Sequence, residues 1–215
     1  MEKIIFFDLD GTLIDSTDAI ISTFYHSFKE LEFEFNGSDE DIKALIGYPL
    51  DVMYVELGVE DERKWDFVDA YKQRYRTISI AQTTLLQNAV ASLELASSFA
   101  RLAIVTTKTT QYTIPLLEHM DIMKYFEGII GRQEVKNPKP HPEPIYKAIE
   151  LLNIDKENHD IYMIGDTKLD LIAAKDAKIK GVGVLCGYGQ FDELSSYTNA
   201  IFRDSLEAVK HIKKC

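Results

Sequence analysis

Two carboxylates stand one residue apart near the start of the chain, directly after an apolar run. Residues 4–7 are all apolar, Asp8 and Asp10 follow, and Gly11 comes next. Two like charges this close repel each other, so the pair indicates a cation or a shared proton nearby. The apolar run suits a strand buried on both faces of a parallel sheet, and the carboxyl end of such a strand is where open α/β sheets bind ligands. The pair therefore predicts acid chemistry at a ligand-binding sheet edge.

Two other interpretations of this stretch remain open from its residues alone. Asp-Gly between apolar segments is also the commonest signal of a β-hairpin. An EF-hand loop beginning at Asp8 fits less well, because Gly11 would stand at the fourth position rather than the sixth, and Ala19 would replace the bidentate Glu. The decision between a hairpin and an active site depends on whether other strand ends supply matching chemistry.

Later segments bring such chemistry to the ends of further predicted strands. Thr106 and Thr107 follow the apolar run 102–105 and offer hydroxyls and backbone amides. Lys139 stands between two prolines, which stiffen the backbone around it and would aim its side chain. A threonine pair is typical of a turn, and a lysine among prolines is typical of a solvated loop. Their value lies in the combination with the carboxylates.

A second acid pair follows the apolar run 161–164. Asp166 comes directly after Gly165, and Asp170 stands four residues later. If a helix begins here, positions four apart share a face, so both carboxylates can face one cleft. Gly-Asp-Thr alone is typical of a capped helix start. Together, the acid pairs, the hydroxyls and the lysine predict one site at the carboxyl edge of a sheet.

The elements that would position these residues follow from the apolar pattern. Residues from about 16 to 80 are nearly all helical in pattern, whereas strands alternate with helices from residue 85 onward, which indicates a parallel sheet with helices on its faces. Ser38 and Asp41 resemble a capping box, and Pro115 should kink or shorten its helix. We expect strands at 4–7, 102–105, 126–130, 161–164, 182–185 and 199–202, and helices at about 16–31, 38–47, 49–57, 61–78, 88–99, 112–120, 142–152, 168–177 and 204–212.

The predicted fold class is α/β, with a Rossmann-like parallel sheet as the core and an all-helical cap inserted after the first strand. We assign residues 1–15 and 84–215 to the core and residues 16–83 to the cap. An insertion at this point would lie directly above the carboxyl end of the first strand. The cap should therefore act as a lid over the acid pair.

Charge and composition narrow the possible partners. The 215 residues include 24 basic and 35 acidic side chains, for a formal net charge of −11. This excess repels a nucleic-acid backbone or an anionic membrane at long range, so we expect neither as a partner. No apolar stretch has transmembrane length and the N-terminus does not resemble a signal peptide, so we expect a cytoplasmic protein, as a monomer or weak homodimer. Cys186 and Cys215 provide no disulfide framework.

The chain resembles the haloacid dehalogenase-like hydrolase superfamily, whose members are mostly phosphatases. The helical block is similar to the small helical cap of that superfamily, and the segment 46–50 resembles the cap loop of phosphoglycolate phosphatase-like members. Gln87-Asn88 stands where relatives usually carry Pro-Gly, and Thr107 stands where they often carry Asn; neither change removes a reacting group. The resemblance spans nearly the whole chain and rests on four motifs in the expected order: Asp8-Leu9-Asp10-Gly11-Thr12, Thr106, Lys139, and Gly165-Asp166-Thr167 with Asp170.

This resemblance implies a phosphatase that forms an aspartyl-phosphate. Asp8 would attack phosphorus, while Asp10 would protonate the leaving alcohol and then activate the water that hydrolyses the intermediate. Thr106 and Lys139 would hold the transferring oxygens, and the lysine charge would stabilise the transition state.

The resemblance also implies the ligands of a metal ion and of the substrate. Mg²⁺ would be held by the carboxylates of Asp8 and Asp166 and by the backbone carbonyl of Asp10, with Asp170 orienting a metal-bound water. Backbone amides of Leu9, Asp10 and Thr107 would donate to the phosphate. The further substrate-binding residues would be Lys108, Gly47 and Tyr48, with Lys43, Arg74 and Arg76 as additional candidates in the cap.

The substrate would be a small phosphorylated metabolite, with 2-phosphoglycolate as one candidate. A sugar-phosphate mutase similar to β-phosphoglucomutase, a pyrophosphatase and a non-enzymatic phosphate-binding regulatory domain are the alternatives. A true haloacid dehalogenase characteristically lacks the second acid of the first motif, so the presence of Asp10 argues against that activity.

Overall fold

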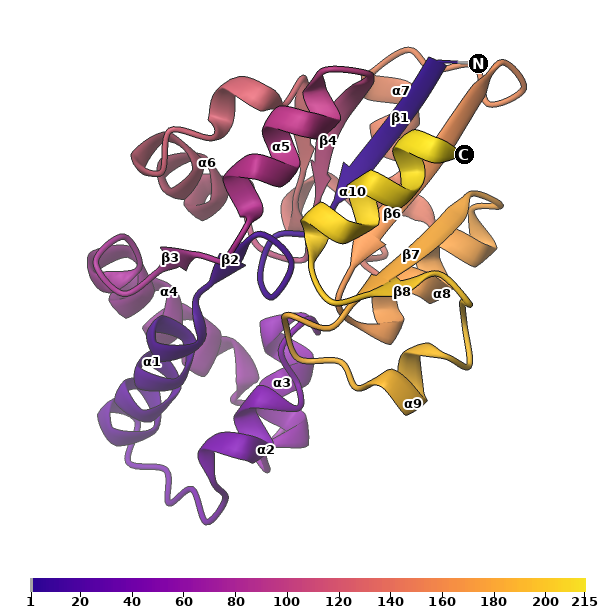
Figure 1. Cartoon of the computed structure of the whole chain (residues 1–215). Helices are drawn as coiled ribbons and strands as arrows, with labels where there is room; N and C mark the ends of the chain where they lie inside the picture. Colours follow the sequence, from indigo (N-terminus) through magenta and orange to yellow (C-terminus); the bar gives the residue numbers. More distant parts are fainter. Residues whose placement is uncertain (1) are drawn as a thin grey trace.

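A six-stranded parallel sheet forms the centre of the molecule (Figure 1). The structure is a computed structural model that describes residues 2–215. The strand order is β5-β4-β1-β6-β7-β8, and each neighbouring pair is parallel. The strands are β1 (Glu2–Phe7), β4 (Ala100–Val105), β5 (Gly128–Ile130), β6 (His159–Gly165), β7 (Lys180–Val184) and β8 (Ile201–Phe202).

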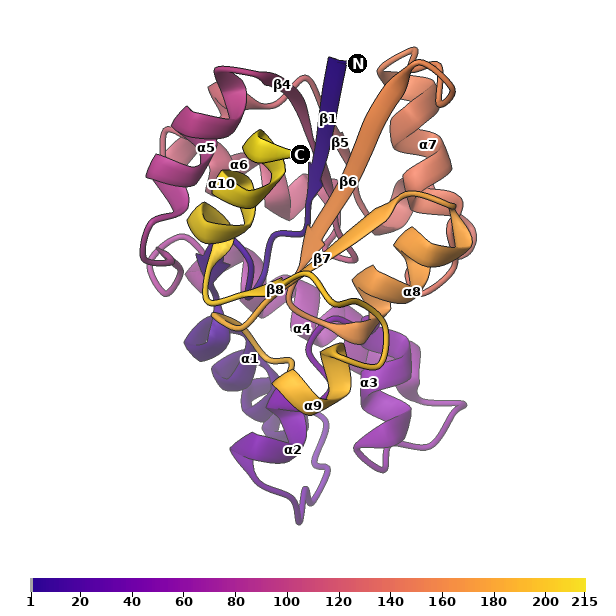
Figure 2. The ribbon, with the colours of Figure 1, turned by 45° about the vertical axis from the view of Figure 1, so that its right-hand side comes forward.

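Helices cover both faces of this sheet, which explains why β1 is apolar at successive positions (Figure 2). Ile4 and Phe6 pack with α7 and α8 on one face, and Ile5 and Phe7 pack with α5, α6 and α10 on the other. Burial of each such side chain stabilises the fold by about 1.5–3 kcal/mol, so β1 holds both cores together. These helices are α5 (Ala89–Ser97), α6 (Thr110–His119), α7 (Glu143–Leu151), α8 (Lys168–Asp176) and α10 (Ser205–Lys214); α9 (Phe191–Leu194) and the 3₁₀ turns Met123–Tyr125 and Arg132–Glu134 are short.

The register of the sheet brings three strand ends to the same edge. Phe7, the last residue of β1, pairs with Ile104 of β4 on one side and with Ile164 of β6 on the other. Asp8 and Asp166 therefore leave the sheet within one residue of the same level, close to the end of β4. This is the edge that the acid pairs predicted.

The four helices between β2 and β3 form a second packed unit, at the bottom of Figure 1. Their shared core is aromatic, with Phe24 in contact with Phe28, Tyr54 and Tyr71 at ring-centroid distances of 4.7–5.9 Å. The chain enters and leaves this unit through β2 (Ile14–Asp15) and β3 (Thr84–Leu85), which pair antiparallel. The helices are α1 (Thr17–Glu30), α2 (Asp39–Lys43), α3 (Leu50–Glu56) and α4 (Lys64–Ile78).

The α/β fold class and the parallel sheet are confirmed, whereas the cap boundaries at residues 16 and 83 stay a prediction. The hairpin interpretation of Asp8–Gly11 is wrong, because β1 pairs in parallel with β4 and β6 and β2 pairs with β3. The capping box of Ser38 and Asp41 is confirmed, but its helix ends at Lys43 rather than near residue 47. The helix α6 continues through Pro115 to residue 119.

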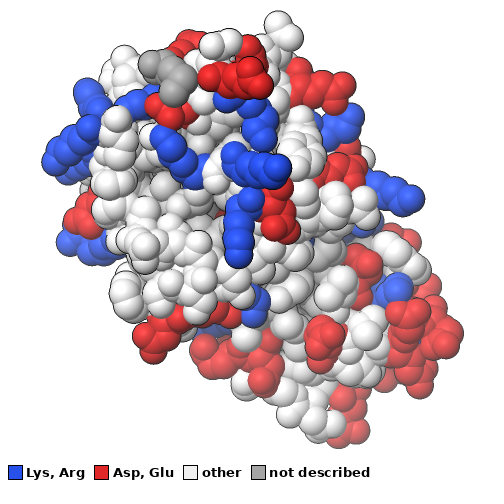
Figure 3. Space-filling model, turned by 90° about the vertical axis from the view of Figure 1, so that its right-hand side faces the viewer, with Lys and Arg blue, Asp and Glu red and all other residues white. Residues whose placement is uncertain are grey.

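Charged side chains are unevenly distributed over the surface. Acidic residues gather on the lower part of the face in Figure 3, on the side where α1–α4 lie, and Lys and Arg lie mostly in its upper part. Within residues 2–215, no helix combines the length and apolarity that crossing a membrane requires.

Candidate active site

Three buried carboxylates meet at the carboxyl edge of the sheet. Single oxygens of Asp8, Asp166 and Asp170 all lie within 4.8 Å of one another, and each residue is at most 4% exposed. Lys139 reaches the same cluster: its Nζ lies 2.5 Å from Asp170 Oδ1 and 2.8 Å from Asp8 Oδ1, and it donates to the Val105 carbonyl at 3.0 Å. Four residues that the sequence predicted to share a site are therefore in direct contact or close to it.

The start of α8 positions Asp170. Its Oδ2 accepts hydrogen bonds from the Thr167 backbone amide at 3.1 Å and from Thr167 Oγ1 at 2.8 Å. This reciprocal capping box satisfies groups at the helix N-terminus that would otherwise lack partners. The other carboxylate oxygen of Asp170 contacts Lys139. The capping box therefore positions the lysine as well as the start of α8.

Loops at the ends of two other strands hold Asp166. Thr12 Oγ1 donates to Asp166 Oδ1 at 3.0 Å, and the Tyr188 backbone amide donates to Oδ2 at 2.8 Å. A Cβ atom at Gly11 or at Gly187 would collide with Asp166 Oδ2, so both positions need glycine for this close approach. The Gly187–Gly189 segment after β7 was not predicted, although two glycines at a strand's carboxyl end are a usable signal.

Burial makes this cluster electrostatically costly without a further cation. Burial raises the pKa of Asp8 to about 7, since the attraction of Lys139 offsets only part of the desolvation and Asp170 adds repulsion. Burial, and then the charges of Asp8 and Asp170, raise the pKa of Asp166 well above its ordinary value. Burial alone would lower the pKa of Lys139, but Asp170 and Asp8 raise it above its ordinary value. The lysine is thus charged and shared among carboxylates that are not fully neutralised.

The cluster fits a hard divalent cation such as Mg²⁺. Asp8 Oδ1 is fully buried and, although close to Lys139, accepts no hydrogen bond in good geometry from residues 2–215. Oxygen ligands from one or two carboxylates are what Mg²⁺ prefers, and a buried carboxylate oxygen without a donor is stabilised by such an ion. Asp8, Asp166 and Asp170 supply the oxygens.

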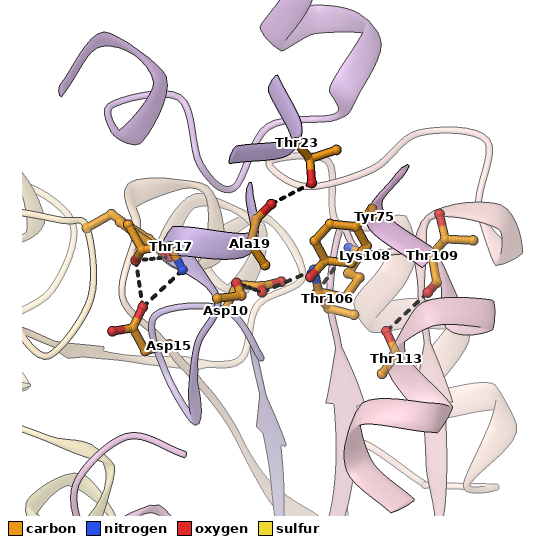
Figure 4. A network of polar contacts seen from close by, with 12 residues as sticks. Asp10, Asp15, Thr17, Ala19, Thr23, Tyr75, Thr106, Lys108, Thr109 and Thr113 are labelled. Atoms are coloured by element: carbon orange, nitrogen blue, oxygen red, sulfur yellow. Dashed lines mark hydrogen bonds and ion pairs between the residues drawn. The ribbon is translucent and has the colours of Figure 1, made fainter. Parts of the chain in front are cut away.

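The carboxylate of Asp10 does not belong to this cluster. It lies beside a different lysine, Lys108 (Figure 4). Lys108 Nζ lies 3.2 Å from Asp10 Oδ1, and Ser16 Oγ donates a short hydrogen bond to the same oxygen. Lys108 Nζ also donates to the Tyr75 hydroxyl at 2.9 Å and lies 4.6 Å from the centre of that ring. Burial alone would lower the pKa of Lys108, but Asp10 raises it above its ordinary value, and Tyr75 adds to this effect. Lys108 thus joins the end of β1 to α4.

Hydrogen-bond donors for an anion lie close to Asp8 and Asp10. Thr106 is buried at the end of β4, and its Oγ1 accepts from the Lys108 backbone amide at 3.1 Å. In the described part of the chain, the backbone amides of Leu9, Asp10 and Thr107 have no hydrogen-bond acceptor. These three amides were the ones predicted to donate to a phosphate, and they remain available for one.

A cavity of about 340 Å³ begins at Asp10 and extends between the sheet edge and the helices α1, α3 and α4. The predicted substrate-binding residues Gly47, Tyr48, Thr107 and Lys108 lie on its wall. The proposed cap anchors Lys43, Arg74 and Arg76 are not on this wall, and Lys43 instead pairs with Glu40 at 2.7 Å. Wall residues that were not predicted as site residues include Trp65, Tyr71, Lys72, Tyr75, Tyr112 and Arg132.

Comparisons with known sequences agree with this arrangement. The family model described as haloacid dehalogenase-like hydrolase matches residues 5–184. A probable phosphatase, IndB, from Dickeya dadantii is 32% identical over 97% of this chain and 92% of its own length. A phosphoglycolate phosphatase from Colwellia psychrerythraea is 28% identical (91% and 90% covered), and a putative pyrophosphatase, PpaX, from Caldanaerobacter subterraneus is 28% identical (98% and 94% covered).

Solved structures share the same fold. A haloacid dehalogenase-like family hydrolase from Streptococcus pneumoniae superimposes with a TM-score of 0.87 at 29% identity, with 98% of each chain covered. A predicted phosphatase from Clostridium acetobutylicum superimposes with a TM-score of 0.90 at 26% identity, and both chains are covered completely.

Proposed function

Because this chain belongs to the haloacid dehalogenase-like hydrolase family, we propose that it is a Mg²⁺-dependent phosphatase that hydrolyses a small phosphomonoester through an aspartyl-phosphate at Asp8. The enzyme is a phosphoric monoester hydrolase, and the relatives named above include phosphatases. The observation that carries the proposed mechanism is the buried Asp8 oxygen without a hydrogen-bond donor, beside Lys139 and two further carboxylates.

In the first half-reaction, an Asp8 carboxylate oxygen attacks phosphorus and forms a new P–O bond. The bond between phosphorus and the substrate's ester oxygen breaks, and the Asp10 carboxyl gives its proton to that leaving oxygen. In the second half-reaction, the Asp10 carboxylate takes a proton from water as the water oxygen attacks phosphorus. The bond to Asp8 then breaks, which releases inorganic phosphate and restores both aspartates.

The surrounding groups hold the phosphoryl oxygens during both steps. Lys139 contributes a fixed positive charge, and Thr106 and the amides of Leu9 and Thr107 contribute hydrogen-bond donors. Phosphoryl transfer depends mainly on such positioning and charge neutralisation. Asp8 and Asp166 would hold Mg²⁺, and Asp170 would orient a water on the ion. The ion would neutralise charge on the phosphate and on the carboxylates.

We propose that the substrate belongs to the class of small phosphorylated metabolites. Relatives carry the names phosphoglycolate phosphatase and putative pyrophosphatase, so 2-phosphoglycolate and inorganic pyrophosphate are the first two compounds to assay. A sugar-phosphate mutase would instead return the phosphoryl group to a sugar. Measurement of free phosphate distinguishes hydrolysis from that reaction.

The decisive experiment is phosphate release from p-nitrophenyl phosphate with Mg²⁺, measured for the wild-type protein and Asp8→Asn. We expect turnover by the wild type, loss of turnover in excess chelator, and at least about a 10³-fold loss in Asp8→Asn, since the nucleophile is removed. Asp192→Asn, which changes an exposed aspartate on α9, is the matched control. Near-normal turnover by Asp8→Asn would refute the nucleophile, and full turnover in chelator would refute the metal.

A further inference from the structure

The cavity beside Asp10 lies where the leaving group of a phosphomonoester must be. Asp10 is the proposed proton donor to the leaving oxygen, and it lines the cavity whereas Asp8 does not. The volume of about 340 Å³ falls in the range of roughly 300–1,000 Å³ that is typical of pockets for drug-sized ligands. Glycolate, with two carbons, would leave most of this space unfilled.

The wall of this cavity is mainly apolar and aromatic. Side chains of this kind reach it from α1, α3, α4, α6 and the loop before α3. Trp65, at the start of α4, lines the cavity and is 54% exposed. Wall residues that matter for the argument are Ile46, Met53, Trp65, Val68, Tyr71 and Tyr112.

Among residues 2–215, three cations line this cavity, and only Lys108 is closely paired with a carboxylate. Lys108 is held between Asp10 and Tyr75, and Arg132 donates to the Val135 carbonyl at 3.1 Å. Lys72 is more than a third exposed and lies 4.0 Å from Asp69. A carboxylate among the apolar and aromatic wall residues would have no paired cation beside it, and a buried carboxylate without one is costly.

One polar group does point to a ligand. Tyr71 is 5% exposed and lines the cavity, its ring stacks on Tyr75 at 5.4 Å, and its hydroxyl, which is not fully closed off from solvent, makes no hydrogen bond to residues 2–215. Buried tyrosine hydroxyls usually find a partner. A polar atom on the leaving group would supply it.

We propose that the leaving group is a ring-bearing alcohol whose ring enters this cavity and whose polar substituent hydrogen-bonds to Tyr71. This inference rests on the proposed function, because it assumes that Asp10 faces the leaving oxygen. The expected substrates are ring-bearing phosphomonoesters, with a higher kcat/KM than 2-phosphoglycolate. The aromatic wall would bury the ring, and Tyr71 would distinguish a polar ring from a plain hydrocarbon ring.

The test compares three phosphomonoesters: 2-phosphoglycolate without a ring, benzyl phosphate with an apolar ring, and uridine 5′-monophosphate with a polar ring. We expect kcat/KM for both ring compounds to exceed that for 2-phosphoglycolate by at least about tenfold, since one methylene in an apolar pocket already changes it by about 10–200-fold. Equal or higher kcat/KM for 2-phosphoglycolate would overturn the proposal. The same ranking is measured as Kd on Asp8→Asn with Mg²⁺, so that a failure of the catalytic assignment and a failure of the ring preference give different results.

Two variants, each with a control, test whether the cavity causes the preference for ring-bearing substrates. Val68→Phe narrows it and should lower the ratio of kcat/KM for benzyl phosphate over 2-phosphoglycolate by at least about tenfold, whereas Val90→Phe, at an exposed valine on α5, should not. Tyr71→Phe should lower the ratio for uridine 5′-monophosphate over benzyl phosphate by about threefold to tenfold. Tyr146→Phe removes an exposed hydroxyl on α7 and is its control. Unchanged ratios in Val68→Phe and Tyr71→Phe would overturn the proposal.

Discussion

Replacement of Asp8 should stabilise the metal-free protein while it abolishes catalysis. The carboxyl group of Asp8 has a pKa of about 7 in the folded chain against 3.8 for the ordinary group, chiefly because it is buried. A carboxyl whose pKa is raised on folding binds its proton more tightly in the folded state. Its favourable contribution to stability is complete below pH 3.8 and is lost as the pH rises through 7. Asn at this position carries no charge and avoids that loss.

The magnitude follows from the two pKa values. About three units, at about 1.4 kcal/mol per unit, amount to about 4 kcal/mol of destabilisation at high pH. Between pH 5 and pH 8, linkage gives a loss of about 2–3 kcal/mol from this group alone. The difference in the free energy of unfolding between Asp8→Asn and the wild type should therefore grow by about 2–3 kcal/mol over this interval.

Urea denaturation in excess chelator at pH 5 and pH 8 measures this difference directly. Asp192→Asn, at an exposed position, controls for the chemical change and should show no such growth. Addition of Mg²⁺ should stabilise the wild type at pH 8 more than it stabilises Asp8→Asn, since the ion binds the folded state through the charged carboxylates. A difference that is independent of pH, or that shrinks as the pH rises, would refute the assignment of Asp8 as a buried, incompletely neutralised carboxylate.

Two further changes test the supports of the cluster. Lys139→Met keeps the volume but removes the ammonium group, so the free energy of unfolding of the metal-free protein in urea should fall by about 3–5 kcal/mol at neutral pH. Turnover should fall by at least about 10²-fold. Lys210→Met, at an exposed lysine of α10, is the control, and equal effects in both variants would contradict the assignment of Lys139 to the carboxylate cluster. Gly187→Ala places a methyl group against Asp166 Oδ2, so thermal melting should show about 1–3 kcal/mol of destabilisation and a Mg²⁺ titration should show weaker binding. Unchanged Mg²⁺ affinity in this variant would exclude Asp166 from the metal site.

The centre of the site could be predicted because parallel strands impose a common edge. Once residues 4–7, 102–105 and 161–164 are recognised as buried strands of one sheet, Asp8, Thr106 and Asp166 must follow their carboxyl ends. Lys139 was harder to predict, since it comes from a loop. Its arrival at 2.8 Å from Asp8 depends on the path of the chain between β5 and α7.

The cavity wall could not be predicted from spacing. Tyr71 and Tyr75 occupy apolar positions at helical spacing on α4, and the same spacing is typical of a helix that faces only its own core. Whether a face of α4 meets the cap core or the sheet edge depends on how the helical unit sits over the sheet. That orientation is set in part by β2 and β3, which have two residues each and are too short for any apolar pattern to reveal.

The two acids of the first motif, Asp8 and Asp10, differ in the lysine that lies beside each of them. Lys139 lies 2.8 Å from Asp8 and continues to Asp170, on the side of the carboxylate cluster. Lys108 lies 3.2 Å from Asp10 and continues to Tyr75, on the side of the cavity. The sequence indicated one cation or one shared proton for both acids, whereas the structure places a different lysine beside each acid. A phosphate bound between them would therefore have the proposed nucleophile on its metal side and the proposed proton donor on its leaving-group side, as hydrolysis through an aspartyl-phosphate requires.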